Sequence, residues 1–275
     1  MIIRKAGIIC KHGSDLPRRI GAEIAAWFAA RGVVAETDQI SADMDILVIL
    51  GGDGTLLHVA DQAAHYGIPV VGVNLGSLGF LTEIVVEERY AALEQIVAGS
   101  PSIEDRLMLK ARLAGRQGGG EWRYALNDVV ISKGNVDRLV RMEVWADGEF
   151  LNSYKADGLI LSTPTGSTAY NLSAGGPIVH PAVKAILVTP ICPFMLESRP
   201  VLLPHTASLL VKIAGPCHDV KVITDGRSTW DMGEGDQLEV GVAETPLRLI
   251  CPPSQGYFEI LRRKLNWGGN STIPD

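Results

Sequence analysis

The pattern of hydrophobic and polar positions changes about a third of the way along the chain. In the first hundred residues, short apolar runs alternate with longer segments in which apolar side chains recur every three or four positions. Buried parallel strands read as continuous apolar runs, and the helices that connect them carry one apolar face, so this part predicts a parallel sheet covered by helices. The predicted strands are 5–10, 46–50 and 68–73, and the predicted helices start at Leu16, at Leu56 (to Tyr66) and at Glu87 (to Val97).

After Ser100-Pro101 the segments become short, alternate with a period of two and are separated by glycine-containing turns, which indicates an all-β domain. Asp147-Gly148 is a strong hairpin signal. The predicted strands are 108–113, 122–132, 140–146, 149–155, 159–161, 208–214, 220–224, 237–242 and 247–251.

The tail returns to a helical pattern at 258–265, where Leu261 and Leu265 share one side. A lone helix with an apolar face needs a surface to cover, so we expect this segment to pack on the first domain. The predicted domains are therefore 1–101, 102–252 and a C-terminal segment, 253–275. The fold class is α/β plus all-β, with a Rossmann-like N-terminal domain and a β-sandwich-like second domain.

Composition limits the partners. The 275 residues hold 25 Lys and Arg against 31 Asp and Glu, a formal net charge of −6, which does not suit a general nucleic-acid binder. No apolar run approaches the roughly 20 residues that span a bilayer, and the N-terminus lacks a secretory signal, so we expect a cytoplasmic protein without a membrane partner. The four cysteines form no C-x-x-C pair and are expected to be reduced thiols.

The loop Gly51-Gly52-Asp53-Gly54-Thr55 stands between a predicted strand and a predicted helix. Glycines there allow close approach of a ligand, and the start of a helix offers N–H groups to phosphate. The same residues also suit a tight turn in which Asp53 or Thr55 only caps the helix. The chain has neither a P-loop lysine motif nor a complete G-x-G-x-x-G. Asp53 is thus a candidate for orienting Mg²⁺ or for accepting a proton from an attacking hydroxyl.

A second candidate element is 163–170, Thr-Pro-Thr-Gly-Ser-Thr-Ala-Tyr, which follows an apolar strand. Its hydroxyl groups can bind ribose and amide groups, and Tyr170 can stack on a ring. The alternative is a Ser- and Thr-rich turn that leads into a helix.

Several polar and charged positions in the second domain also have an ordinary structural interpretation. Asn127 and Asp128 interrupt an apolar strand, so one of them faces the interior and needs a partner, for which a ribose diol is suited. A bulge or an edge position is the alternative. Asp157 by itself is an ordinary turn residue, and Arg138 and Lys155 by themselves are solvated charges.

Taken together, these motifs resemble those of the bacterial NAD kinases. The resemblance covers nearly the whole chain and is carried by 51–55, 76–80, 126–130, 156–158, 163–170, 175–177, 189–193 and 265–268. The glycine–acid loop alone is shared with diacylglycerol-type lipid kinases and is similar to that of phosphofructokinases. The element 163–170 discriminates far better.

The resemblance implies an enzyme that transfers the γ-phosphoryl group of ATP to the 2′-hydroxyl of the adenosine ribose of NAD, which makes NADP. Asp53 would accept the proton, and Gly51, Gly52, Gly54 and Thr55 would form the phosphate loop. A divalent ion, Mg²⁺, would arrive with ATP rather than at a fixed protein metal site. The family also implies a homodimer or homotetramer.

The resemblance further implies a set of NAD contacts. Phe80 would line the adenine pocket, Asn127 and Asp128 would hold ribose and adenine-side groups, and Asp157 would hold the nicotinamide side. The remaining contacts it implies are Asp53, Gly54, Arg138, Lys155, Thr168, Ala169, Tyr170, Asn171, Leu172, Ser173, Cys192 and Arg227.

Three positions depart from the family pattern. Asp128 stands where Glu is usual, Phe194 where His is usual, and Arg227 where Gln is usual. Two other functions compete with the kinase: a lipid kinase that shares only the glycine loop, and a non-catalytic NAD(P) sensor. An acyl-chain groove would favour the first, and NADP binding without turnover would favour the second.

Overall fold

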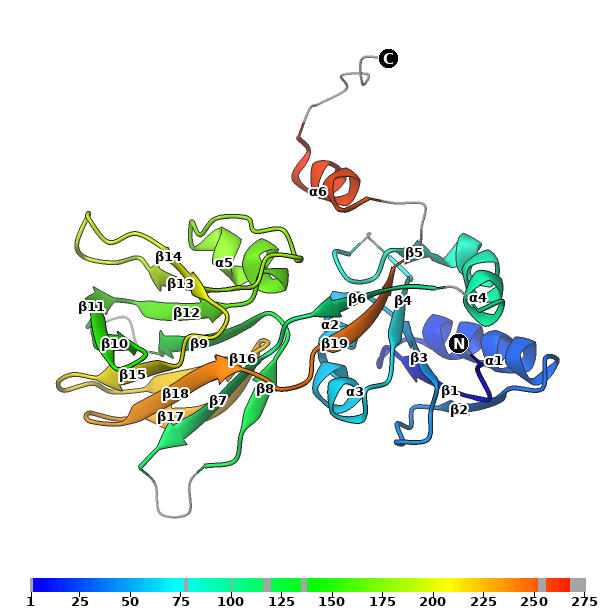
Figure 1. Cartoon of the computed structure of the whole chain (residues 1–275), viewed down its shortest axis with the longest axis horizontal. Helices are drawn as coiled ribbons and strands as arrows, with labels where there is room; N and C mark the ends of the chain where they lie inside the picture. Colours follow the sequence, from blue (N-terminus) through cyan, green and yellow to red (C-terminus); the bar gives the residue numbers. More distant parts are fainter. Residues whose placement is uncertain are drawn as a thin grey trace. The chain divides into compact units, whose positions relative to one another are not determined.

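The chain forms two compact units in the computed structural model (Figure 1), which describes residues 2–76, 79–99, 101–115, 120–134, 138–251 and 256–267. Unit 1 combines Met1–Asp105 with Leu247–Asp275, and unit 2 is Arg106–Pro246. Ser77, Leu78 and Gly268 of the family-like motifs, and much of the predicted tail segment, lie outside the described residues. None of the helices in the described ranges has the length and apolar character needed to span a bilayer.

Unit 1 is built on a sheet with the strand order β2-β1-β3-β4-β19-β6, in which β5 also pairs with β4. The pairs from β2 through β19 along this order are parallel. The strands are β1 (Lys5–Cys10), β2 (Val34–Thr37), β3 (Ile46–Leu50), β4 (Val70–Asn74), β5 (Ile84–Val85), β6 (Ser102–Arg106) and β19 (Leu247–Cys251). The helices are α1 (Asp15–Ala29), α2 (Asp53–Leu57), α3 (Ala60–Tyr66), η1 (Val86–Glu88), α4 (Arg89–Val97) and α6 (Tyr257–Leu265).

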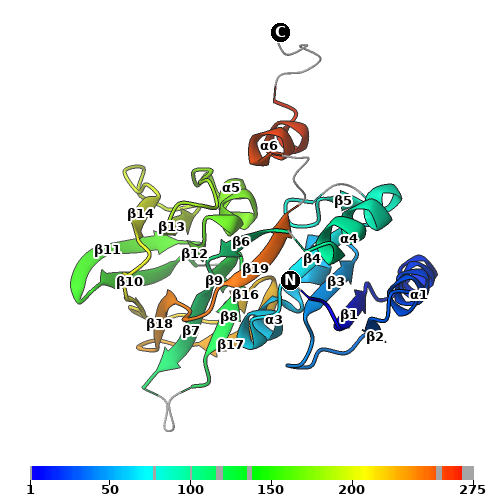
Figure 2. The same cartoon turned by 45° about the vertical axis from the view of Figure 1, so that its right-hand side comes forward.

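The apolar pattern explains how helices cover this sheet. Ile24 and Phe28 of α1 and Leu93 of α4 are fully buried in one core with alternate residues of the central strands. α3 lies on the other side of the sheet from α1 and α4, as Figure 2 also shows. The Rossmann-like α/β prediction for the first hundred residues is therefore confirmed.

Two details of unit 1 differ from the sequence prediction. The helix expected at 56–66 is two helices, α2 and α3, because the helical path breaks at His58 and Val59. The strand 247–251, assigned above to the all-β domain, is β19 of unit 1, where Leu249 pairs with Val70. That assignment was wrong because the apolar pattern of a strand does not indicate which sheet the strand joins.

Unit 2 consists of two six-stranded sheets that share one core. The first has the order β11-β10-β15-β18-β7-β8, and the second β14-β13-β12-β9-β16-β17. The strands are β7 (Leu109–Ala114), β8 (Arg123–Ala125), β9 (Asp128–Lys133), β10 (Val140–Ala146), β11 (Glu149–Ala156), β12 (Gly158–Ser162), β13 (Ala185–Ile191), β14 (Val201–Pro204), β15 (Leu209–Ile213), β16 (Val220–Thr224), β17 (Arg227–Met232) and β18 (Gln237–Val242).

Inward-facing side chains of both sheets, among them Leu113 and Val211 from the first and Leu161 and Val222 from the second, form a single buried cluster. The β-sandwich-like prediction is thus confirmed. The strand predicted over 122–132 is two strands, β8 and β9, in different sheets, and the chain crosses between the sheets at Leu126 and Asn127.

The outer face of the second sheet is covered as well. All five residues of β12 are buried, and Ile160 packs with Val130 and Ile191 on the side away from the sandwich core. The short helices η2 (Thr165–Thr168) and α5 (Tyr170–Ser173) contact β12 and hold the hydroxyl-rich element over this sheet.

Candidate active site

The glycine loop leaves the end of β3, whose five residues are all buried. The N–H of Gly51 donates to the carbonyl of Val73 at 3.0 Å, which ties the loop to β4. A side chain on Gly51 would collide with Thr55, whereas Gly52 and Gly54 face open space. The loop is therefore anchored at its start and accessible along its middle.

Asp53 does not cap the helix it starts. The N-cap of α2 is Gly52, and no side chain makes a capping hydrogen bond there, so the interpretation of this loop as a capped turn is wrong. The carboxylate of Asp53 instead accepts the N–H of Phe80 at 2.8 Å on Oδ2. Its Oδ1 accepts the N–H of Leu81 and the N–H and hydroxyl of Thr82, each at 3.1 Å.

This contact fixes the loop that carries Phe80. A Cβ on Gly79 would overlap the Asp53 carboxylate, so glycine is required there for the close approach. Asn74 at the end of β4 supports the same loop by donating from Nδ2 to Thr82 Oγ1 at 2.9 Å. Phe80 itself is half-buried, and the ammonium of Lys264 on α6 lies 5.8 Å from its ring centroid.

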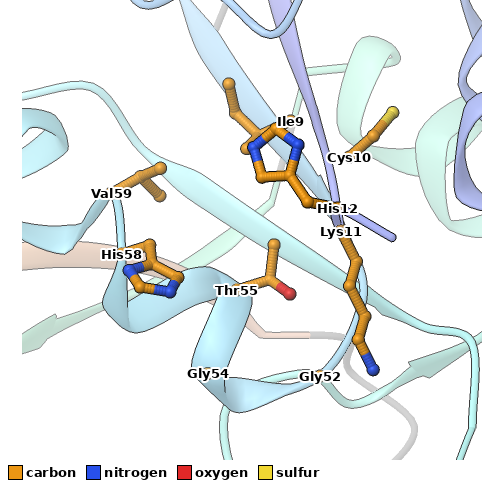
Figure 3. Close-up of a pocket in the computed structure, with 9 residues that line it drawn as sticks. All are labelled: Ile9, Cys10, Lys11, His12, Gly52, Gly54, Thr55, His58 and Val59. Atoms are coloured by element: carbon orange, nitrogen blue, oxygen red, sulfur yellow. The ribbon is translucent and has the colours of Figure 1, made fainter. Parts of the chain in front are cut away.

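Two cavities adjoin the glycine loop in unit 1. The larger, of about 560 Å³, is lined by Ile9, Cys10, Lys11, His12, Gly52, Gly54, Thr55, His58 and Val59 (Figure 3). The smaller, of about 220 Å³, is lined by Lys11, Ser14, Leu16, Pro17, Gly51, Gly52, Asn74, Leu75 and Gly76. Lys11 and Gly52 belong to both.

In unit 2, Asn127 and Asp128 are held by a residue that the sequence did not single out. The carboxylate of Asp225 accepts the N–H groups of Leu126, Asn127 and Asp128 at 2.7, 2.8 and 3.1 Å. Asp225 has a φ of 45°, and the Asp225-Gly226 turn aims its side chain at the start of β9. The sequence signal that could have found it is the Asp225-Gly226 pair, which is typical of a turn.

Burial gives Asp128 unusual electrostatics. Its side chain is only 6% exposed, and burial together with the nearby negative charge of Asp225 raises the pKa of Asp128 from 3.8 to about 7. Burial also raises the pKa of Asp225, although its three backbone hydrogen bonds act in the opposite direction. Asp128 is therefore poised to change charge near neutral pH.

The hydroxyl-rich element is fastened to the same point. Thr163 Oγ1 donates to the carbonyl of Leu126 at 2.6 Å, and the N–H of Thr163 donates to the carbonyl of Asn127 at 2.9 Å. A Cβ on Gly166 would overlap the carbonyl of Asn127, so this glycine allows the element to pack directly on the β8–β9 crossover. The structure thus brings 127–128 and 163–173 together, as the candidate site requires.

Residues 168–173 differ in what they expose. Tyr170 and Ser173 are exposed, whereas Thr168, Ala169 and Leu172 are half-buried. Asn171 is fully buried, and its Nδ2 donates to the carbonyls of Ser167 and Pro177 while its Oδ1 accepts the hydroxyl of Thr189. The side chain of Asn171 is thereby committed to holding the element in place.

A second group of predicted residues lies at the other end of β12. Asp157 forms an ion pair with Lys133 at 2.6 Å, and the exposed Lys155 lies over the ring of Phe194 at 5.1 Å. The exposed Cys192 has a φ of 45° and follows Ile191, whose carbonyl accepts the N–H of Asp157. In the register of β12, Ser162 faces Asp128 and Gly158 faces Ser132, so the two groups are separated by about 13 Å of strand.

The remaining predicted contacts, Arg138 and Arg227, are both exposed. No three histidine, cysteine or acidic side chains within the described ranges gather closely enough to hold a metal ion. The site residues that sequence reasoning missed are Lys11, Thr82, Lys133 and Asp225, because isolated polar residues give no motif until the fold places them beside one.

Comparison with known proteins agrees with this arrangement. Residues 16–100 match the ATP-NAD kinase N-terminal domain and residues 126–251 the ATP-NAD kinase C-terminal domain. The chain is 42% identical to the NAD kinase of Geotalea daltonii, with 97% of this chain and 99% of that protein covered. It is 40% identical to the NAD kinase of Aromatoleum aromaticum, with coverages of 99% and 91%.

Solved structures give the same result. The crystal structure of yeast NADH kinase complexed with NADH superposes with a TM-score of 0.88 at 26% identity and covers 100% of this chain and 90% of its own. An NAD kinase from Archaeoglobus fulgidus in complex with ATP has the same fold, with a TM-score of 0.76, 23% identity and coverages of 95% and 98%. The chain belongs to the NAD kinase family.

Proposed function

We propose that this chain transfers the γ-phosphoryl group of ATP to the 2′-hydroxyl of the adenosine ribose of NAD and so makes NADP. The observation that carries the proposal is the near full-length similarity to proteins named NAD kinase, at 40% identity or more. The geometry supports it, because unit 1 presents an accessible glycine loop with an ordered carboxylate and unit 2 presents a hydroxyl-rich element with an exposed aromatic ring.

Asp53 is the proposed proton acceptor. A ribose hydroxyl is a poor acid, so it needs a base in hydrogen-bonding reach while charge on the transferred group is neutralised. Each carboxylate oxygen has about two acceptor sites. Oδ1 of Asp53 already accepts three hydrogen bonds and Oδ2 only one, so Oδ2 is the atom with room for a substrate hydroxyl.

A divalent ion, for which we propose Mg²⁺, fits this site as a companion of ATP. The Asp53 carboxylate is engaged by the loop 80–82, which leaves phosphate oxygens as the natural ligands of the ion. When bound, the ion neutralises charge on the transferred phosphoryl group. Gly51, Gly52, Gly54 and Thr55 form the proposed phosphate loop.

NAD would be held by exposed and half-buried groups of unit 2, with Phe80 of unit 1 at the adenine. Asn127 and Asp128 are the proposed ribose and adenine-side contacts, and Tyr170 is the proposed stacking ring. Asn171 acts on the nucleotide by positioning this element, because its amide is already bonded within the protein. The other proposed contacts are Gly54, Arg138, Lys155, Asp157, Thr168, Ala169, Leu172, Ser173, Cys192 and Arg227.

The family resemblance is also the ground for proposing a cytoplasmic homodimer or homotetramer. NADH is a second candidate acceptor, because the yeast relative is an NADH kinase complexed with NADH. The same assay distinguishes the two acceptors when NADH replaces NAD.

The test is NADP formation from NAD, ATP and Mg²⁺, followed with an NADP-specific dehydrogenase. We expect robust product from the wild type, and a loss of turnover of at least about a hundredfold in Asp53→Asn with NAD binding retained, the scale of general-base removal. The matched control is Thr82→Val, which removes one hydrogen bond to Asp53 but leaves the carboxylate in place. Its turnover should fall by less than about tenfold.

The outcomes separate the competing functions. NADP binding without turnover in the wild type would favour the non-catalytic sensor, and phosphorylation of lipid in vesicles would favour the lipid kinase. Equal losses in Asp53→Asn and Thr82→Val would make Asp53 a loop anchor and not the base.

A further inference from the structure

The larger cavity beside the glycine loop contains a cation that the proposed mechanism has not used. Lys11 follows β1, and its N–H donates to the carbonyl of Leu50 at 2.9 Å, so its backbone is fixed to the end of β3. Its side chain starts against the loop, because a Cβ on Gly51 would stand 3.1 Å from the Cβ of Lys11. Figure 3 shows this side chain extending along the loop toward Gly52.

The described lining of the cavity combines one lysine with hydrogen-bonding groups. Lys11, His12 and His58 all line it with Thr55, and none of the lining residues in the described ranges is Asp or Glu. The smaller cavity, which Lys11 shares, likewise has no Asp or Glu among its described lining residues. An anion entering either space would meet a positive charge without opposing a carboxylate.

The contacts of Asp53 explain why its own negative charge does not enter this space. Asp53 stands between Gly52 and Gly54 in the sequence, yet its carboxylate is bound to the N–H groups of 80–82 and lines neither cavity. Within the described part of the chain, Lys11 itself pairs with no carboxylate. Its ammonium is therefore available to a ligand.

Size and backbone shape also suit a nucleotide. A cavity of about 560 Å³ is in the range of small-molecule sites. Gly52 and Gly54, on its lining, have no atom within 4 Å of where a Cβ would stand, so phosphate oxygens can approach the backbone directly.

We propose that Lys11, with His12 beside it, binds the polyphosphate of the phosphoryl donor in this cavity. The inference rests on the proposed function and adds to it the residue that supplies positive charge. In P-loop enzymes a lysine within the motif has this task. In this chain the lysine follows β1, the strand that pairs with β3, and reaches the glycine loop from outside it.

The test compares Lys11→Met with Lys11→Arg, and uses Lys184→Met as a control at an exposed lysine of unit 2. We expect kcat/KM for ATP to fall about tenfold to a hundredfold in Lys11→Met, the range for losing a charge-assisted hydrogen bond, while KM for NAD stays within about twofold. Lys11→Arg should restore most of the loss because it keeps the charge, and Lys184→Met should match the wild type.

Calorimetric binding of ATP and of inorganic tripolyphosphate shows which part of the donor is recognised. Weaker binding of both ligands to Lys11→Met supports a polyphosphate site, and weaker binding of ATP alone overturns it in favour of contact with the nucleoside. An unchanged kcat/KM for ATP, or a rise confined to KM for NAD, also overturns the inference.

Two further readouts keep the test decisive. If Lys11→Met unfolds at a lower temperature than the wild type, the Lys11→Arg variant decides the question. A folded Lys11→Arg protein with normal ATP binding supports a charge-based role for Lys11. A folded Lys11→Arg protein that has lost ATP binding overturns the inference. If the wild type makes no NADP, the proposed function fails, whereas tripolyphosphate binding that depends on Lys11 would still support the site.

Discussion

Each unit of this molecule uses one aspartate to hold three consecutive backbone N–H groups. In unit 1, Asp53 holds 80–82, and in unit 2, Asp225 holds 126–128. Carboxylate–amide bonds of this kind are about twice as strong as neutral ones, so both segments are fixed firmly. The same hydrogen-bonding arrangement therefore occurs at two different backbone segments.

The surroundings make the two aspartates differ. Asp53 lies in a glycine loop beside two cavities whose lining, over the described residues, has no acidic side chain, so its free acceptor capacity can serve a substrate. Asp225 lies near the buried Asp128, where burial raises the pKa of both carboxyls and the charge of Asp225 raises that of Asp128 further. The comparison shows that the hydrogen bonds fix a backbone segment, whereas burial and neighbouring charge decide whether the aspartate can also act on a substrate.

The largest expected effect comes from breaking the anchor in unit 2. Asp225→Ala leaves three N–H groups at the sheet crossover without their acceptor, and we expect the free energy of unfolding to fall by at least about 4 kcal/mol. Asp53→Ala should lower the free energy of unfolding by only about 1 to 2 kcal/mol, because the loop 79–82 does not join two sheets around a shared core. Denaturant melts of both variants measure the difference, and equal losses would contradict it.

A smaller effect should follow from removing the buried charge. The folded-state pKa of Asp128, about 7, lies above its ordinary 3.8, so its contribution to stability is fully present below about pH 4 and is lost as pH rises through 7. The substituted side chain in the Asp128→Asn variant is neutral at every pH. As pH rises from 4.5 to 8.5, the free energy of unfolding of this variant should increase by about 2 to 4 kcal/mol relative to that of the wild type. Thermal melts across this range measure the gain, and a constant difference between the two proteins would disprove it.

The smallest of these effects should come from the contact between the hydroxyl-rich element and the crossover. Gly166→Ala places a methyl group against the carbonyl of Asn127, and we expect a loss of about 1 to 3 kcal/mol with a raised KM for NAD. Gly241→Ala, at a strand glycine whose Cβ would meet nothing within 4 Å, is the matched control and should change neither value. A Gly166→Ala protein that behaves like this control would show that the element tolerates displacement.

Local sequence was sufficient to predict most elements. Strands 46–50, 140–146, 220–224 and 237–242 have the predicted bounds, because their alternation or continuous apolar character depends only on neighbouring residues. The change at Ser100-Pro101 precedes the observed boundary, because β6 (Ser102–Arg106) still belongs to the sheet of unit 1 and unit 2 starts at Arg106. The closeness of 127–128 to 163–173 followed from the family resemblance, and the register of β9 with β12 now gives its geometric basis.

Apart from the break of the 56–66 helix at His58 and Val59, the main failures concern partners distant in sequence. Leu247–Cys251 was given to the wrong domain, and the crossover at Leu126 and Asn127 was read as part of one strand. Neither Lys11 nor Asp225 belongs to a motif, and each gains its role only from the backbone it reaches.

The sequence by itself determined the two fold classes, their order along the chain, and the two loops that hold the candidate chemistry. Periodicity and glycine content are properties of neighbouring residues, so they can be read without a structure. Only the tertiary structure decided which sheet takes β19, which carboxylate is buried, and which side chains reach the loops. Those outcomes depend on contacts between segments far apart in the chain, such as Asp53 with 80–82 and Asp225 with 126–128, for which a local pattern carries no signal.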